Sequence, residues 1–460
     1  MHSTSPRIVA LLLILFLATP AFSKEERKET AREKAERLWG NGHHKTVSLS
    51  LKECLGRATT LNRQLEVADY DIKTAEEKEN EVRKIGFPVL EYEYNVGPAP
   101  KDVSHAIDSF FSGDLTVFNK LKVGLGIPLQ TFGKVGTGKQ LADLGIRVEK
   151  EKKEAKKKEI ALRVHELYNG ILLAREIRRL LDTAARELGK EIEKREEKGG
   201  GDPSALLKLK LFHAELERRL EEVDKKEIMA KEALRILVDV DPTIGFDIRS
   251  DRLYRTEATL ASFEKYQGEA LDQRDDLQQL DIAYQAREKK LFLERRLTTP
   301  NLGLGAFFEM GRTPNVTGIT TTDDFSDPLN FTRAGVGLRL SGQFDFHGTA
   351  AKIRQAKSEL KKTEIQRDLA RDGIVLELKE AYLNVRNASQ EIERTEEAGK
   401  LSRQLLFLTQ SNYDIGLAEP KDFVDAIQSF LETRGKYFEA VFNYNVAVAR
   451  LSQKTGKDAS

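Results

Sequence analysis

The chain has 460 residues, with 75 Lys and Arg against 74 Asp and Glu, and only 40% of its residues are hydrophobic. This composition excludes a helical membrane protein, which needs many long apolar segments. A single cysteine excludes a disulfide scaffold, and the balanced charge argues against a nucleic-acid partner.

Residues 1–23 are expected to be a secretory signal peptide. Arg7 precedes an apolar run over residues 8–18, and small residues before position 24 suit cleavage after Ser23. The run is shorter than an ordinary transmembrane helix, and a signal anchor is the alternative. The sequence therefore predicts an exported protein.

A charged leader over residues 24–46 follows the signal peptide. Its adjacent His43 and His44 lack partner ligands and are weak evidence for metal binding, so no metal or cofactor is expected. Cys54 lies within a predicted helix, where a small core residue is the ordinary role, although export leaves a free thiol as the alternative.

From residue 47 onward, the same succession of elements occurs twice. In each repeat, apolar residues first recur at helical spacing, then two stretches alternate apolar and polar residues as strands do, and two helices separated by a sharp break follow. The first repeat covers 47–240, with a helix over 47–84, strands over 87–97 and 115–129, and helices over 138–198 and 204–238. The second covers 241–456, with a helix over 256–297, strands over 301–311 and 332–344, and helices over 349–414 and 421–454.

Equivalent residues of the two repeats are separated by a nearly constant offset. Leu65 and Leu277 are 212 positions apart, and Pro203 and Pro420 are 217 apart. Because the offset drifts by so little over such a distance, we infer an internal duplication.

The long helix of each repeat holds about 60 residues and would be about 90 Å long. Such a helix must bury its apolar stripe on other helices as a coiled coil, and the two shorter helices could lie end to end along it. The strands are long enough to span a bilayer, but four cannot close a barrel and open edges are not tolerated in lipid. Three copies would supply twelve strands. A soluble β-hairpin domain at the end of a coiled coil is the alternative.

Several short motifs occur in the order that one known family shows. The turn over residues 413–418 is followed by a helix start over 422–426, and the matching motifs of the two repeats are 62–65 with 274–277 and 123–129 with 336–340. These motifs resemble those of the TolC-like outer-membrane efflux proteins, although Asp275 stands where proline is common in the family. The resemblance covers nearly all of residues 47–456.

The resemblance implies a mainly helical, internally duplicated coiled-coil tunnel with four transmembrane β-strands per chain. Three chains would close a twelve-stranded barrel in the outer membrane, continuous with a tunnel through the periplasm. The implied partners are a periplasmic adaptor protein, an inner-membrane transporter and outer-membrane lipid. The implied function is that of an export duct in a tripartite efflux or type I secretion system, without enzymatic activity.

The resemblance also assigns candidate site residues near the periplasmic end. Asp422 and Asp425 stand where the family can carry acidic residues around the aperture, and six carboxylates in a narrow pore would favour cations. The alternative, compatible role is helix capping, because Pro420 suits the first position of a helix and acids complement its dipole.

Residues at the two helix breaks are candidate contacts for the adaptor. One tip offers Gly416, Leu417 and Ala418, and the other offers Gly200 and Gly201. The tip of the first repeat, at Gly200 and Gly201, is richer in glycine and has only Asp202 as an acidic residue, so the two tips are expected to differ in adaptor contact or flexibility.

The stretch Gly133–Lys139 nearly matches a phosphate-binding loop, but Gln140 replaces the hydroxyl residue that binds Mg²⁺. Its glycines are expected instead to ease the transition from strand to helix. An enzyme is therefore disfavoured, and the remaining alternative is a periplasmic coiled-coil structural protein with β-hairpin tips. Charges predicted to line the lumen are mixed and indicate no particular cargo: Glu91, Glu93, Lys120, Lys122, Arg333 and Arg339.

Overall fold

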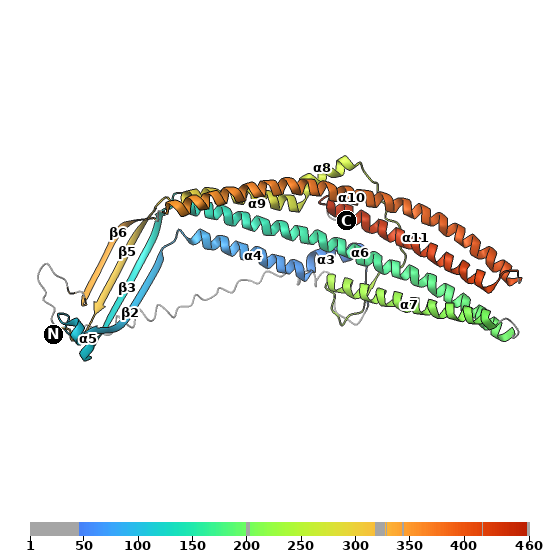
Figure 1. Cartoon of the computed structure of the whole chain (residues 1–460), viewed down its shortest axis with the longest axis horizontal. Helices are drawn as coiled ribbons and strands as arrows, with labels where there is room; N and C mark the ends of the chain where they lie inside the picture. The colour runs from blue at the N-terminus through green and yellow to red at the C-terminus, as the bar shows by residue number, and fades with distance from the viewer. Residues whose placement is uncertain are drawn as a thin grey trace.

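The computed structural model describes residues 46–198, 203–317, 327, 329–342, 345–415 and 417–457. The molecule is elongated, with a four-stranded sheet at one end and long helices running away from it (Figure 1). The signal peptide and nearly all of the charged leader lie outside the described residues. The strands are β1 Val47–Leu49, β2 Val89–Pro100, β3 Leu115–Gln130, β4 Phe246–Ile248, β5 Asn301–Arg312 and β6 Phe331–Ser341. The helices are α3 Leu51–Leu61, α4 Arg63–Lys84, α5 Ala106–Ser112, α6 Lys134–Lys198, α7 Pro203–Leu237, α8 Phe263–Gln273, α9 Asp275–Arg296, α10 Phe346–Asp414 and α11 Pro420–Lys454.

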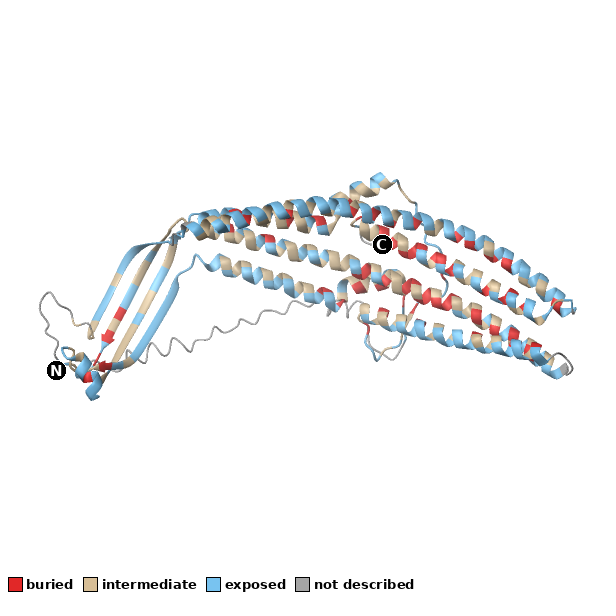
Figure 2. Ribbon diagram, viewed as in Figure 1, coloured by how far each residue is buried: buried red, intermediate tan, exposed pale blue. Residues whose placement is uncertain are grey.

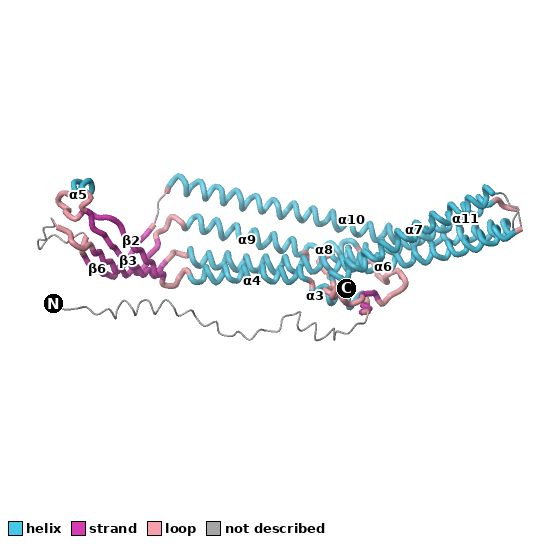
Figure 3. Tube along the Cα trace, turned by 90° about the horizontal axis from the view of Figure 1, so that it is seen from below, coloured by secondary structure: helices cyan, strands magenta, loops and turns pink. Residues whose placement is uncertain are grey.

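The helices run alongside one another, away from the sheet, and form an extended wall (Figure 3). The two long helices, α6 and α10, have 65 and 69 residues and are each about 100 Å long. Near the sheet α6 packs against α4 and α9, and α9 packs against α10. Towards the far tip α6 packs against α7 and α11, and α11 packs against α10. The shorter helices thus lie end to end beside the long ones, as the repeat pattern predicts.

The first helix of each repeat is broken where the sequence predicts a single continuous helix. The expected helix over 47–84 starts with the short strand β1 and is interrupted at Asn62, and α8 and α9 are separated at Arg274. Asn62 is the N-cap of α4: its side chain accepts a hydrogen bond from the Gln64 backbone N–H at 2.8 Å. Apolar spacing continues across both breaks, which explains why periodicity alone does not reveal them.

Asn62 also ties α4 to the end of α7. Its buried amide donates a hydrogen bond to the backbone carbonyl of Leu237 at 3.0 Å. We expect Asn62→Ala to lower the free energy of unfolding by about 1–2 kcal/mol, because it removes a cap and leaves the partly buried Leu237 carbonyl without this hydrogen bond. Asn62→Asp, which retains the cap acceptor but loses the donor, should lose less. Chemical denaturation of the three proteins measures the difference, and an unchanged midpoint for Asn62→Ala would contradict this role.

The four long strands form an antiparallel sheet in the order β2-β3-β5-β6. Paired residues place most of the large apolar side chains of the central register on one face, which we call the apolar face, while Phe307 lies on the opposite face. The apolar face includes Leu90, Tyr92, Tyr94, Leu121, Val123, Leu125, Leu304, Phe308, Val336, Leu338 and Leu340. The opposite, charged face carries Glu91, Glu93, Lys120, Lys122, Glu309, Arg333 and Arg339. Within the described chain, the outer edges of β2 and β6 pair with no other strand of the sheet.

Residues 238–262, which we call the strap, connect the two repeats and cover one face of the helical wall. The strap contains β4, which pairs in parallel with β1 from the start of the first repeat. Val238, Ile248 and Leu253 of the strap are buried in a cluster with Val164 of α6 and Leu378 of α10. Buried residues lie mainly where the helices meet, while most other helical surface is exposed (Figure 2). The strap itself is mostly exposed and is held by these few buried side chains.

Among the described residues, no helix combines the length and the apolar character that crossing a membrane requires.

Candidate functional site

The charged face of the sheet is organised around Glu309 of β5. Its carboxylate accepts a bond from Lys120 of β3 at 2.6 Å and another from Arg333 of β6 at 2.9 Å. Three strands are thereby linked on the face that carries the charges. The sequence predicts Lys120 and Arg333 as charges that line the lumen but does not predict Glu309, although its position directly after Phe308 in an alternating strand indicates the charged face.

The strand-to-helix transition before α6 explains the glycine-rich stretch. Phe132 and Gly133 adopt left-handed conformations with φ of 50° and 86°, which glycine tolerates without strain. From Lys134 onward the stretch is already helical, so it does not form the loop that cradles phosphates. Among the described residues, no group of three or more acidic, histidine or cysteine side chains could hold a metal ion.

The tip formed by α10 and α11 carries most of the candidate site residues. Asp422 is exposed and accepts a hydrogen bond from the Glu419 backbone N–H at 3.2 Å, as part of a capping box at the start of α11. Asp425 lies one turn further along the helix and is also exposed. Leu417 is exposed and Ala418 is half-buried. The candidates Gly416, Gly200 and Gly201 lie outside the described residues.

Below this tip, the two repeats are joined by an aromatic cluster that the sequence analysis does not predict. The rings of Tyr413 and Phe423 stack with centroids 4.8 Å apart, and the Arg195 guanidinium from α6 lies 4.6 Å from the Tyr413 ring. Burial raises the pKa of the Tyr413 hydroxyl to about 12, so the ring stays neutral at physiological pH. Apolar residues of α6, α7 and α11 complete the cluster. The tips of both repeats are therefore packed together as one unit.

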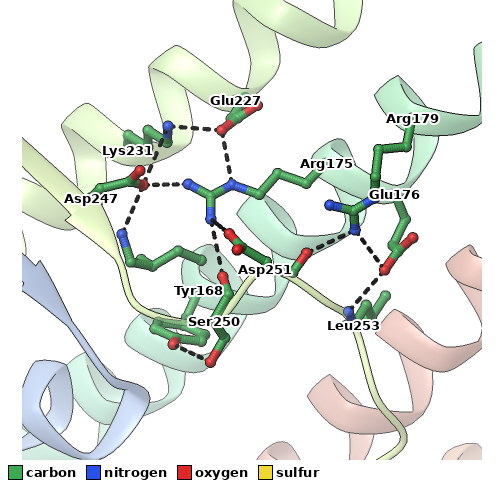
Figure 4. A network of polar contacts seen from close by, with 11 residues as sticks. Tyr168, Arg175, Glu176, Arg179, Glu227, Lys231, Asp247, Ser250, Asp251 and Leu253 are labelled. Atoms are coloured by element: carbon green, nitrogen blue, oxygen red, sulfur yellow. Dashed lines mark hydrogen bonds and ion pairs between the residues drawn. The ribbon is translucent and has the colours of Figure 1, made fainter. Parts of the chain in front are cut away.

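A buried polar network holds the strap against α6 and α7 (Figure 4). Arg175 of α6 is central: its guanidinium bonds Glu227 of α7 at 3.1 Å, Asp247 of the strap, and both the Ser250 carbonyl and the Asp251 carboxylate near 3 Å. Lys231, Glu176 and Arg179 extend the network to Leu253 and the Asp251 backbone.

The electrostatics of this network favour the ionised form of its carboxyl groups. Burial alone would raise the pKa of Glu227, but bonds from Lys231 and Arg175 outweigh it, and the net pKa lies below the ordinary value. The pKa of Asp247 is likewise lowered, because the Ile248 backbone N–H, Arg175 and Lys231 outweigh its burial. The strap is thus fixed by full charges at neutral pH.

Comparison with known proteins supports the resemblance predicted from the sequence. Residues 267–457 match the family model described as outer membrane efflux protein. That family is one of channels rather than enzymes, and the matched stretch runs from within α8 to just beyond the end of α11. No curated protein matches the chain in sequence.

Solved structures share the fold over nearly the whole chain. The CmeC outer membrane channel of Campylobacter jejuni is 15% identical with a TM-score of 0.69, over 90% of this chain and 89% of that one. VceC of Vibrio cholerae is 17% identical with a TM-score of 0.67, over 89% and 97%. The open state of the MtrE outer membrane channel of Neisseria gonorrhoeae is 15% identical with a TM-score of 0.68, over 92% and 94%. The chain has the fold of these outer membrane channels.

Proposed function

We propose that three copies of this chain form an export duct that spans the outer membrane and extends into the periplasm. The observation that carries the proposal is the two-faced sheet with open edges on β2 and β6, joined to a helical wall that also has open edges. An apolar face suits lipid and a charged face suits a water-filled lumen. Unpaired edges cannot remain in lipid, and twelve strands from three copies would pair them all.

The match of residues 267–457 to the outer membrane efflux protein family supports the location and the transport role. The same match supports a periplasmic adaptor and an inner-membrane transporter as partners. A duct is passive, so an energy-coupled transporter would have to drive export through it. The exposed tip around Leu417 is the candidate docking surface for the adaptor.

Fractionation and electrophysiology of the full-length protein test this function. We expect trimers that dissociate only on heating, located in the outer membrane, and stable single-channel currents after reconstitution in planar bilayers. Wholly soluble periplasmic protein without channel activity would instead support the alternative of a coiled-coil structural protein.

We propose separate contributions for the two candidate aspartates at the aperture. Asp422 is engaged by the helix start, whereas Asp425 is exposed and no hydrogen bond or ion pair to it is observed within the described chain. We expect Asp425→Asn to reduce cation preference without changing thermal stability, because three carboxylates leave the pore. We expect Asp422→Ala to change both, because a cap is lost as well.

Reversal potentials under a salt gradient measure the cation preference, and thermal dissociation of the trimer measures stability. Exposed Glu432 of α11, which pairs with Lys436 further from the tip, provides a matched control as Glu432→Gln. An Asp425→Asn channel with unaltered reversal potential would exclude the aperture role.

A further inference from the structure

A groove of about 530 Å³ crosses the middle of the helical wall, and we call it the central groove. Helix α11 forms its floor, and α6 and α10 form its two sides. Its volume lies in the range of small-molecule sites. Its lining residues are Arg163, Glu166, Leu167, Ala381, Asn384, Ala388, Phe442, Asn443, Val446, Ala447 and Arg450.

The central groove opens on the face of the wall that the strap leaves uncovered. On α11, Asn445 bonds the strap at the Tyr254 carbonyl and the Thr256 N–H, whereas the groove residues Asn443 and Arg450 project from the other side of the same helix. On α6, Tyr168 bonds Ser250 of the strap, and the groove residues again lie opposite. A strap inside a duct would obstruct it, so the strap lies outside and the groove faces the lumen. This step rests on the proposed function.

A second copy of the chain cannot fill this groove without occupying the lumen. The open edges of the wall are α4 and α7 on one side and α10 on the other, and neighbouring copies pack there. The groove lies on the inner face between α6 and α10, within a single chain. Its occupant must therefore be a molecule small enough to travel through the duct.

The lining chemistry defines the kind of molecule. The floor and sides offer the Phe442 ring with Leu167, Val446 and alanine side chains, and Phe442 extends towards Gly170 of α6, which has no side chain to fill the space. At the rim, Glu166 accepts bonds from Arg163 at 2.9 Å and Arg450 at 3.0 Å. Two guanidinium groups face one carboxylate, so the rim retains one positive charge with unused N–H donors.

We propose that the central groove is a lumenal binding site for amphipathic organic anions, which have an apolar, preferably aromatic, body and a carboxylate, sulfate or sulfonate group. The body would lie on Phe442 and the alanine sides, and the anionic group would bind the free N–H groups of Arg450 and Arg163. Such a site would retain this class of cargo briefly halfway along the duct.

The test uses the full-length protein in amphipol with a cysteine introduced by Asn443→Cys inside the groove. The native Cys54 is fully buried and burial raises the pKa of its thiol to about 12, so a neutral maleimide should modify only position 443. The probes are 1-anilinonaphthalene-8-sulfonate and its neutral analogue, N-phenyl-1-naphthylamine. We expect the sulfonate to slow modification at about fivefold lower concentration than the neutral analogue, as for one exposed charge interaction.

Three further substitutions in the cysteine background distinguish the contributions. Arg450→Gln should abolish the advantage of the sulfonate, while Phe442→Ala should weaken protection by both probes about tenfold. Gly170→Leu should crowd the Phe442 ring, from which a Cβ at this position would lie 4.0 Å away, and should weaken protection by both probes as well. The control Arg386→Gln removes an exposed arginine of α10 that does not line the groove, and should leave protection unchanged.

The outcomes separate this inference from the proposed function. The anion site is overturned if the sulfonate protects the cysteine at position 443 equally well in Arg450→Gln and in Arg386→Gln. It is also overturned if neither probe protects that cysteine in the parent protein, even if the protein is a conducting trimer. Protein that forms no trimers contradicts the duct, but protection can still be measured because the groove lies within one chain. The pair of probes in the parent protein provides a comparison that does not depend on the folding of any groove variant.

Discussion

Replacing Arg175 by methionine is expected to lower the free energy of unfolding by about 2–4 kcal/mol. The side chain of Arg175 is only 10% exposed and neutralises Glu227, which is 8% exposed, so its removal leaves a buried carboxylate without its guanidinium partner. The expected loss is at the lower end for a buried pair, because Lys231 still contacts Glu227 and Asp251 is largely exposed. The strap should detach from α6 before the rest of the wall unfolds.

Amide hydrogen exchange over residues 245–253 and denaturant unfolding measure these effects. Arg178→Met on the same helix is the matched control: Arg178 is 54% exposed and pairs only with the half-exposed Asp224 in the described structure, so the loss should be below about 1 kcal/mol. Similar losses for both variants would show that the Arg175 network contributes no more than a surface pair.

The same network predicts a dependence on pH. Because the pKa values of Glu227 and Asp247 are lowered in the folded protein, their contribution is complete above the pKa values of the unfolded chain, and falls as the pH drops through the lower folded values. We therefore expect the wild-type strap to loosen below about pH 4. In Arg175→Met, the free energy of unfolding should change less as the pH falls through this range.

A lysine on the apolar face of the sheet is expected to block assembly in the outer membrane. Leu338 lies in the middle of β6 and is 71% exposed in the single chain, where lipid would cover it in the proposed duct. Leu338→Lys should cost about 2–4 kcal/mol per chain near the bilayer midplane, and a trimer carries the cost three times. We expect heat-modifiable trimers to be strongly depleted from the outer-membrane fraction.

The neighbouring residue provides the control because side chains alternate along a strand. Arg339 lies on the charged face, and Arg339→Ser should leave trimer yield unchanged. If Leu338→Lys assembles as well as Arg339→Ser, the apolar face does not contact lipid.

The fold was largely predictable because its determining patterns are local. Alternation at 332–344 identifies β6 and assigns Leu338 and Arg339 to opposite faces without any knowledge of the partners. The long helices follow from uninterrupted apolar spacing between the breaks, and the duplication fixes the order of elements. In the proposed duct, the open edges of the sheet in lipid then require more than one copy.

The features that the sequence did not predict depend on contacts distant in the chain. β1 and β4 have three residues each and are stabilised by pairing across about 200 positions, so neither stretch has a pattern of its own. Arg175 is one of many arginines in a charged helix, and only the position of the strap makes it buried. The stacking of Tyr413 and Phe423 under Arg195 likewise depends on how the two repeats meet.

The breaks between α3 and α4 and between α8 and α9 lie near the level of the strap, whereas α6 and α10 pass that level without interruption (Figure 1). In the proposed duct, a tensile force applied at the helical tips would therefore reach the sheet through α6 and α10, whose backbone hydrogen bonding is continuous. Along the paired shorter helices, the same force would have to cross side-chain contacts and the strap. In a trimer, six such continuous helices would carry the tension between a docked partner and the outer membrane. The strap, which packs on α6 and α10, would keep them from separating.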